Sequence, residues 1–265
     1  MAPFAYAGLM PADELVLDQG VLDERPICEF QAMRAVRHAG GVAVLPWRAD
    51  WLEARARDLR AVAAADELLD ARFSQCLVHL QKSRAATWLD LAQAWARLEP
   101  GGRLLLCGGN DLGVTSAVKR LARELEQTPR ILANRRRARI VAFERDTGPG
   151  PLSPESGQVQ IEGPLDEAIT LRTDPGVFSA RRLDLGSELL LDELSQCKTP
   201  RRILDLGCGV GPLGLTALLR WSDARARLLD ADARAVACAT HNADTLGLGD
   251  RCEVTWWDAS EPLPA

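Results

Sequence analysis

Short apolar runs alternate with amphipathic stretches along the chain, and this pattern predicts strands interleaved with helices. In the first half, we predict strands at Gly41–Pro46, Gln75–Leu80, Arg103–Cys107 and Arg139–Phe143. We predict helices between them at Arg34–Ala39, Trp51–Leu59, Ala85–Leu98 and Val114–Leu125. Pro100-Gly101-Gly102 is expected to end the third of these helices, and residues 1–25 carry no clear element. Alternating strands and helices are typical of a parallel α/β fold.

A segment dense in Gly, Pro and Ser, residues 147–157, predicts a linker between two halves. Beyond it we predict strands at 158–161 and 168–172, a helix at Ser187–Leu194, a strand around Ile203, a helix at Leu213–Trp221 and a strand at Cys252–Trp257. The two halves therefore form an internal α/β repeat at the level of architecture.

The most informative stretch is Leu204–Gly214, in which Asp205 precedes a turn of closely spaced glycines at 207, 209, 211 and 214. Glycines after a strand permit a sharp turn and let a ligand approach the backbone closely. The stretch Gly209–Gly214 fits the G-x-G-x-x-G dinucleotide fingerprint, whereas residues 205–211 fit the D-x-G-x-G-x-G loop of S-adenosylmethionine (SAM) enzymes. A glycine-rich turn without a ligand is the third interpretation.

Strand-end acids favour SAM among these interpretations. Asp205 at a strand tip would repel a pyrophosphate, and it would attract the α-amino group of SAM. Asp230 ends the apolar run Leu228-Leu229, where a carboxylate can accept hydrogen bonds from ribose hydroxyls. Asp258 follows the last predicted strand and can receive the adenine amino group. An NAD-dependent oxidoreductase is the alternative that these acids disfavour.

Three runs carry a resemblance to a known family: PGVFS at 175–179 with the leucine-rich stretch up to Leu191, the glycine stretch at 203–214, and residues 228–248. Together they resemble the methyltransferase small-domain family, strongly over residues 158–265 and weakly over the first half. The resemblance implies an α/β fold of tandem class I methyltransferase-like (Rossmann-like) domains. The expected division is a degenerate domain at 1–146, the linker at 147–157 and a SAM-binding domain at 158–265 that ends after about three strands.

The resemblance also implies a site. The residues expected around SAM are Asp205, Gly207, Cys208, Gly209 and Gly211 at the methionine end, Asp230 at the ribose, and Asp258 with Ala259 at the adenine. Phe178, Ser179 and Ser187 are expected near the cofactor. In the first half the sheet is expected to have lost its early strands, and its glycine-rich turn at 108–113 lacks the G-x-G spacing and is interpreted as a plain turn.

The members of the family that the chain resembles act on ribosomal RNA and transfer a methyl group from SAM to the exocyclic N2 of a guanine, so the resemblance implies an enzyme whose partner is ribosomal RNA or a ribosomal subunit. The guanine would have to be unpaired or flipped to reach the site. The family's Asn-Pro-Pro-Phe/Tyr motif, which grips the target amino group, is absent from these 265 residues. We therefore assign no catalytic residue. The alternative is a non-catalytic, truncated or decayed relative that retains a cofactor-binding fold.

Composition limits the remaining possibilities. The net charge of −5 argues against strong nonspecific binding of nucleic acid by the whole surface. The seven cysteines contain no C-x-x-C pair, which argues against a zinc site or a disulfide framework and suits a reducing cytosol. With no signal-like start and no apolar stretch of membrane-spanning length, we expect a cytoplasmic monomer without metal or membrane contact.

Several other residues have two interpretations. The arginines at 130, 135, 136, 137 and 139 suit RNA phosphate contact or, as we favour, a solvated turn. Trp256-Trp257 suits base stacking or core packing. The histidines at 38, 79 and 241 lack partners at metal-ligand spacing and are interpreted as structural.

Overall fold

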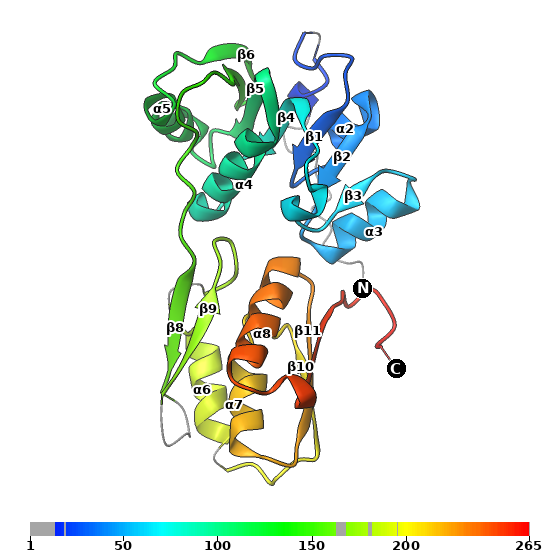
Figure 1. Ribbon diagram of the computed structural model, residues 1–265, viewed down its shortest axis with the longest axis vertical. Coiled ribbons are helices and arrows are strands. Elements are labelled where there is room, and N and C mark those ends of the chain that lie inside the picture. Colours follow the sequence, from blue (N-terminus) through cyan, green and yellow to red (C-terminus); the bar gives the residue numbers. More distant parts are fainter. Residues whose placement is uncertain (1–13, 19, 163–167, 180–181, 195, 265) are drawn as a thin grey trace. The chain divides into compact units, whose positions relative to one another are not determined.

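The computed structural model describes residues 14–18, 20–162, 168–179, 182–194 and 196–264. Ala180 and Arg181, which belong to the run after PGVFS, lie outside this range. The chain divides into two compact units (Figure 1). The first contains the residues up to Pro46 together with Asp50–Pro154, and the second contains Trp47–Ala49 together with Glu155–Ala265.

The first unit is a seven-stranded sheet with helices on both faces. Its strands are β1 (Ile27–Phe30), β2 (Gly41–Val44), β3 (Ala61–Val62), β4 (Phe73–His79), β5 (Leu98–Gly109), β6 (Arg130–Arg135) and β7 (Ala138–Glu144). Its helices are α2 (Arg34–Ala39), α3 (Arg48–Ala56, of which Arg48 and Ala49 fall in the second unit), the 3-10 helix η1 (Ala65–Leu68), α4 (Arg84–Arg97) and α5 (Val114–Glu124). The strand order is β3-β2-β1-β4-β5-β7-β6, and only β7 runs antiparallel to both of its neighbours.

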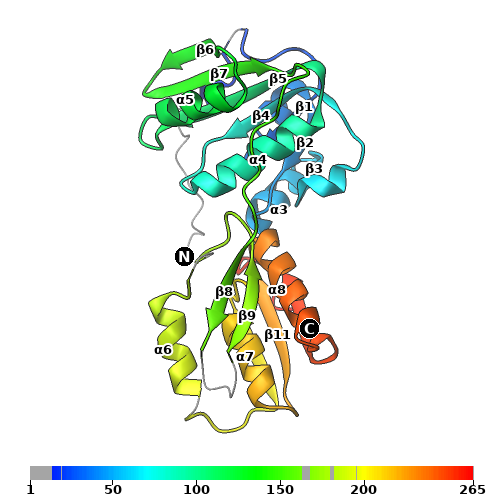
Figure 2. The ribbon, with the colours of Figure 1, turned by 60° about the vertical axis from the view of Figure 1, so that its left-hand side comes forward.

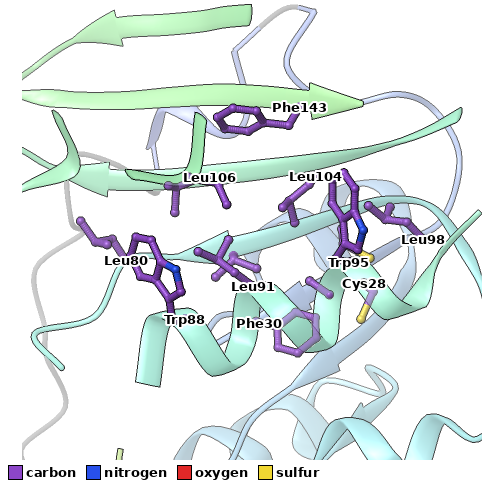
Figure 3. Packing of buried hydrophobic residues seen from close by; sticks show 14 of the residues in the cluster. Cys28, Phe30, Leu80, Trp88, Leu91, Trp95, Leu98, Leu104, Leu106 and Phe143 are labelled. Atoms are coloured by element: carbon purple, nitrogen blue, oxygen red, sulfur yellow. The ribbon is translucent and has the colours of Figure 1, made fainter. Parts of the chain in front are cut away.

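Alternation of side chains along the central strands supplies a core on each face of this sheet. Helices α4 and α5 cover one face, where Trp88, Leu91 and Trp95 of α4 pack against strand residues such as Phe30 and Phe143 (Figures 2 and 3). The opposite face is buried through Ile27, Leu77, Leu105 and their neighbours. The helical spacing of Trp88, Leu91 and Trp95 thus marks the buried stripe of α4.

The expectation that this sheet has lost its early strands is wrong, because β1, β2 and β3 are all present. Strand β1 has only four residues and one of them is charged, so no apolar run marks it in the sequence. Glu29 is nevertheless fully buried, since it accepts hydrogen bonds from the backbone N–H of Val36 and contacts Nε2 of His79 at 2.9 Å. A further difference concerns Pro100-Gly101-Gly102, because α4 ends earlier, at Arg97, and these three residues lie inside the long strand β5.

The second unit contains a two-stranded hairpin, a three-stranded parallel sheet and three helices. Its elements are β8 (Gly157–Ile161), β9 (Ile169–Thr173), α6 (Leu185–Leu194), β10 (Arg202–Leu206), α7 (Pro212–Arg220), β11 (Arg225–Asp230), α8 (Ala233–Thr245), the 3-10 helix η2 (Gly249–Arg251) and β12 (Cys252–Trp256). The order of the parallel sheet is β10-β11-β12. With the first unit, this confirms the α/β class that the sequence predicts.

The sheet of the second unit repeats three of the seven strands of the first, since β10-β11-β12 follows the same order as β1-β2-β3. In the first unit, β1 also pairs with β4, and Cys28 and Phe30 are fully buried. Among the described residues, β10 pairs with β11 alone. Leu204 and Leu206, at the corresponding positions of β10, are 50% and 55% exposed, whereas Cys28 and Phe30 pack with residues of α4.

Candidate functional site

The loop that follows β10 is shaped by its glycines. Gly207, Gly209 and Gly211 have φ values of 74°, 56° and 92°, a left-handed conformation that side chains other than glycine rarely adopt. A Cβ atom built on Gly207 or Gly209 would meet no described atom within 4 Å, so the backbone there is open. At Gly211, by contrast, a Cβ atom would lie 2.8 Å from Cδ1 of Leu215. The first two glycines therefore leave space for a ligand, and the third serves packing.

Asp205 connects the strand to the helix after the loop. Its Oδ2 atom accepts a hydrogen bond of 3.0 Å from the backbone N–H of Gly214 in the first turn of α7. Glycine at position 214 lets the first turn of α7 lie this close to the sheet, because a Cβ atom there would lie only 2.7 Å from Cδ1 of Leu228 in β11. Burial raises the pKa of Asp205 and the charge of Asp230 raises it further, against the lowering effect of the Gly214 hydrogen bond. The site thus holds a carboxylate that lacks full hydration.

Asp230 lies at the end of β11 and holds the loop from the neighbouring strand. Its Oδ2 atom accepts from the N–H of Gly209 at 2.8 Å, and its Oδ1 atom accepts from the N–H of Asp232 at 2.8 Å. Burial raises the pKa of Asp230, and these backbone hydrogen bonds oppose the rise. Each carboxylate oxygen has a second lone pair for another donor.

Asp258 lies two residues beyond the end of β12, in a loop that is fixed by local contacts. Its Oδ1 atom accepts from the N–H and the hydroxyl of Ser260 at 2.9 and 2.6 Å. Its own N–H donates to Glu261, which also pairs with Arg48 of the second unit at 2.9 Å. Ala259 is exposed beside it.

Asp205, Asp230 and Asp258 follow three neighbouring strands and are offset from one another along the strand direction, an arrangement that we call the staircase. Asp205 is level with Leu228 of β11, two residues before Asp230, and Asp230 is level with Trp256 of β12, two residues before Asp258. Two residues of a strand span about 6.6 Å, so Asp230 lies one such step further along the sheet than Asp205, and Asp258 follows in the loop beyond the end of β12. The site is therefore elongated and negative, with the open glycine loop beside its first two acids.

The sequence matches the methyltransferase small domain over residues 168–265 and the methyltransferase small domain N-terminal family over residues 35–154. The chain belongs to the methyltransferase small-domain family. The resemblance carried by PGVFS, the glycine stretch and residues 228–248 is thus confirmed. Each unit matches one of these two domain models, and the two units share the order of their strands.

Two relatives agree with this membership. The chain is 35% identical over 237 residues to the ribosomal RNA small subunit methyltransferase C of Pseudomonas paraeruginosa (strain DSM 24068 / PA7), covering 89% of this chain and 64% of that protein. It is 36% identical to the protein of the same name from Pseudomonas aeruginosa (strain LESB58), covering 88% and 64%. The chain thus spans less than two thirds of these relatives' length.

Among solved structures, the chain is similar to a T. thermophilus 16S rRNA N2 methyltransferase in complex with AdoMet and guanosine. The TM-score is 0.83 at 22% identity, and the match covers 100% of this chain and 73% of that one. At this identity the likeness shows the fold, including the order of both units along the chain.

Three residues expected near SAM, Cys208, Ser187 and Phe178, do not present their side chains as a common ligand site in this methyltransferase small-domain chain. Cys208 is buried, and burial together with the charges of Asp205 and Asp230 raises the pKa of its thiol well above the usual range. Only its backbone is therefore suited to contact a ligand. The hydroxyl of Ser187 donates to Asp184 at 2.7 Å at the start of α6, while Phe178 is 77% exposed.

The remaining candidates have structural contacts. Arg135 and Arg136 pair with Asp18 and Glu14, which weakens the interpretation of this cluster as a surface for RNA phosphates. The indole of Trp256 donates to the carbonyl of Ala231 at 2.9 Å and that of Trp257 to Pro262 at 3.0 Å. Among the described residues no cluster of His, Cys, Asp and Glu suits a metal ion, and no described helix is long and apolar enough to cross a membrane.

The first unit carries a counterpart of the Asp205 site that its own side chains fill. Glu29, like Asp205, is the next-to-last residue of its strand, and each accepts from the third residue of the following helix, Val36 and Gly214 respectively. The loop after β1 has Gln31 at φ 69° in place of the glycines. His79 contacts the Glu29 carboxylate from β4. The first unit therefore differs from the second in the loop after this strand, whereas the order of the strands is shared.

Proposed function

We propose that the second unit binds SAM and that the chain serves methyl transfer to the exocyclic N2 of a guanine in ribosomal RNA. The observation that carries the proposal is the staircase of Asp205, Asp230 and Asp258 beside the open backbone of Gly207 and Gly209. SAM is an elongated ligand with a cationic end, a ribose and an adenine. We assign these three parts to the three acids in that order.

The chemistry of these residues fits SAM better than a dinucleotide. A carboxylate at Asp205 whose pKa is raised by burial is stabilised by a cation, and the α-ammonium group of SAM provides one. The pyrophosphate of NAD would bring negative charge toward both Asp205 and Asp230. The lone pairs that Asp230 retains can accept ribose hydroxyls, and the second oxygen of Asp258 can accept from the adenine amino group.

The relatives' names support ribosomal RNA as the substrate. SAM would supply a methyl group on its sulfonium sulfur: as the guanine N2 forms the new N–C bond, the S–C bond would break, S-adenosylhomocysteine would leave and the surplus N2 proton would pass to solvent. The chain's residues would bind and align the two reactants. The T. thermophilus structure contains guanosine with AdoMet, which supports a guanine as the target. Within this chain, the first unit would recognise the RNA or support folding.

Calorimetric titration with SAM, S-adenosylhomocysteine and NAD tests the cofactor. We expect saturable binding of the first two ligands at one site per chain and no binding of NAD. Binding of NAD without SAM would favour an oxidoreductase and overturn the proposal.

Incubation with radiolabelled SAM and small ribosomal subunits that lack the modification tests the substrate. The proposal predicts label in N2-methylguanosine after digestion of the RNA to nucleosides. Binding of SAM without transfer to any nucleoside would favour the alternative, a non-catalytic relative that retains its cofactor fold. Label in a different nucleoside would show that the target is wrong.

A further inference from the structure

Asn242 is a buried polar residue in the interior of α8. Its side chain belongs to a residue that is only 3% exposed, in a helix whose other buried residues are alanines and a cysteine. Asparagine is a poor helix former, and a buried amide is costly unless it is hydrogen-bonded. Its contacts therefore reveal why the position is polar.

One side of the Asn242 amide pairs with the backbone of β9. Its Oδ1 atom accepts from the N–H of Arg172 at 2.8 Å, and its Nδ2 atom donates to the carbonyl of Arg172 at 3.0 Å. The amide thus bonds β9 as a neighbouring strand would. This pairing fixes the strand immediately before the turn at Asp174–Val177, where the PGVFS run begins.

The second donor of the same amide reaches the glycine loop. Nδ2 donates to the carbonyl of Val210 at 3.0 Å, and this hydrogen bond is buried. Val210 lies between Gly209 and Gly211, both of which have positive φ values. The loop is otherwise held from the sheet, through Leu229 and Asp230. Asn242 therefore fixes the glycine loop from a second side, through a hydrogen bond from helix α8.

We propose that Asn242 is a positioning residue for the cofactor site, whose amide sets the glycine loop and the segment after β9 at a fixed separation. The inference rests on the proposed function, since the loop is the one assigned to SAM. Asn242 itself does not contact the ligand. It acts by keeping the N–H groups and open backbone of Gly207 and Gly209 in the conformation that SAM requires.

Two substitutions separate positioning from simple packing. Asn242→Ala removes all three hydrogen bonds and leaves the Arg172 and Val210 carbonyls without this donor. Asn242→Asp keeps the size and the acceptor for the Arg172 N–H, but it places a carboxylate oxygen against both carbonyls. We expect the affinity for SAM to fall about tenfold in Asn242→Ala and further in Asn242→Asp.

Leu248→Ala provides the matched control, because Leu248 follows α8, is 3% exposed and belongs to the hydrophobic cluster that includes Ala239 and Ala243 of α8. Its loss should lower the melting temperature with little effect on the affinity of the folded protein for SAM. Calorimetry at a temperature where every variant is folded gives the affinities. Amide hydrogen exchange without ligand gives the opening of residues 207–211, a measurement that does not depend on cofactor binding.

The inference predicts faster exchange at the glycine loop and weaker SAM binding in both Asn242 variants, and neither change in Leu248→Ala. Wild-type affinity and exchange in the Asn242 variants would overturn it while leaving the proposed function intact. Equal losses in Leu248→Ala would also overturn it, because the effect would then follow from stability alone. Absence of SAM binding by the unsubstituted chain, with the exchange differences present, would instead reject the proposed function.

Discussion

The substitution Asp205→Asn distinguishes the effect of the buried Asp205 charge on folding stability from its effect on SAM binding. The substitution keeps an oxygen that can accept from the N–H of Gly214, and it removes a charge whose pKa is raised by burial. Folding should therefore be unharmed, because the neutral amide no longer needs the hydration that the carboxylate has lost. SAM would lose an ionic hydrogen bond to its ammonium group.

The expected loss of affinity follows from the geometry. Two unit charges about 4 Å apart at an effective dielectric constant of about 20 attract by about 4 kcal/mol, which is an upper limit for a site that is open to water. A hydrogen bond to a charged group contributes about 1.5–3 kcal/mol. Taking ~2 kcal/mol, the dissociation constant for SAM should rise about 30-fold.

The assay combines calorimetric titration with SAM and thermal unfolding without ligand, for the wild type and Asp205→Asn. We expect the melting temperature to stay level or rise while the affinity falls. An unchanged affinity would refute the assignment of the ammonium group to Asp205. A fall in affinity accompanied by a large fall in melting temperature would refute the electrostatic reasoning, because the carboxylate would then be structural.

Three further predictions follow from the same contacts. Gly209→Ala should destabilise the second unit by about 1 kcal/mol because residue 209 has a positive φ, and thermal unfolding would show this. The added Cβ atom should also abolish SAM binding, which calorimetry would show, and binding at wild-type affinity would contradict the prediction. The pKa values of Asp205 and Asp230 are raised in the folded state, so their contribution to stability is fully present below about pH 4 and is lost as the pH rises through the folded pKa values. The free energy of unfolding in urea should therefore depend less on pH in Asp205→Asn and Asp230→Asn than in the wild type. Glu29→Ala should destabilise the first unit by about 3 kcal/mol, because it removes the buried carboxylate that accepts from the Val36 N–H and contacts His79. The affinity for SAM should not change. A variant as stable as the wild type would refute the structural role of the pair formed by Glu29 and His79.

The sequence predicts much of this architecture because most elements carry a pattern of their own. Helix α4 is marked by Trp88, Leu91 and Trp95 at helical spacing, and the glycine stretch marks the turn between β10 and α7. Strand β1 carries no such mark, since its four residues include Glu29, whose burial depends on partners that lie in α2 and β4. Strand β3 has only two residues and forms by pairing with β2.

The candidate site divides in the same way. Asp205, Gly207 and Gly209 are local in sequence and follow a known spacing, so they can be named from the sequence. The staircase cannot, because the step between Asp205 and Asp230 is set by the register of β10 with β11. Asn242 also escapes prediction, since its partners lie 32 and 70 residues away and a single asparagine in a helical stretch carries no signal of its own.

Backbone amide chemical shifts of the isotope-labelled chain during titration with SAM test the central claim most directly. The account predicts saturable shifts at Gly207, Gly209 and Gly211, at Asp230 and at Asp258–Ala259, with residues 35–154 unaffected. Shifts confined to the first unit, or none at the glycine loop at saturating SAM, would contradict it.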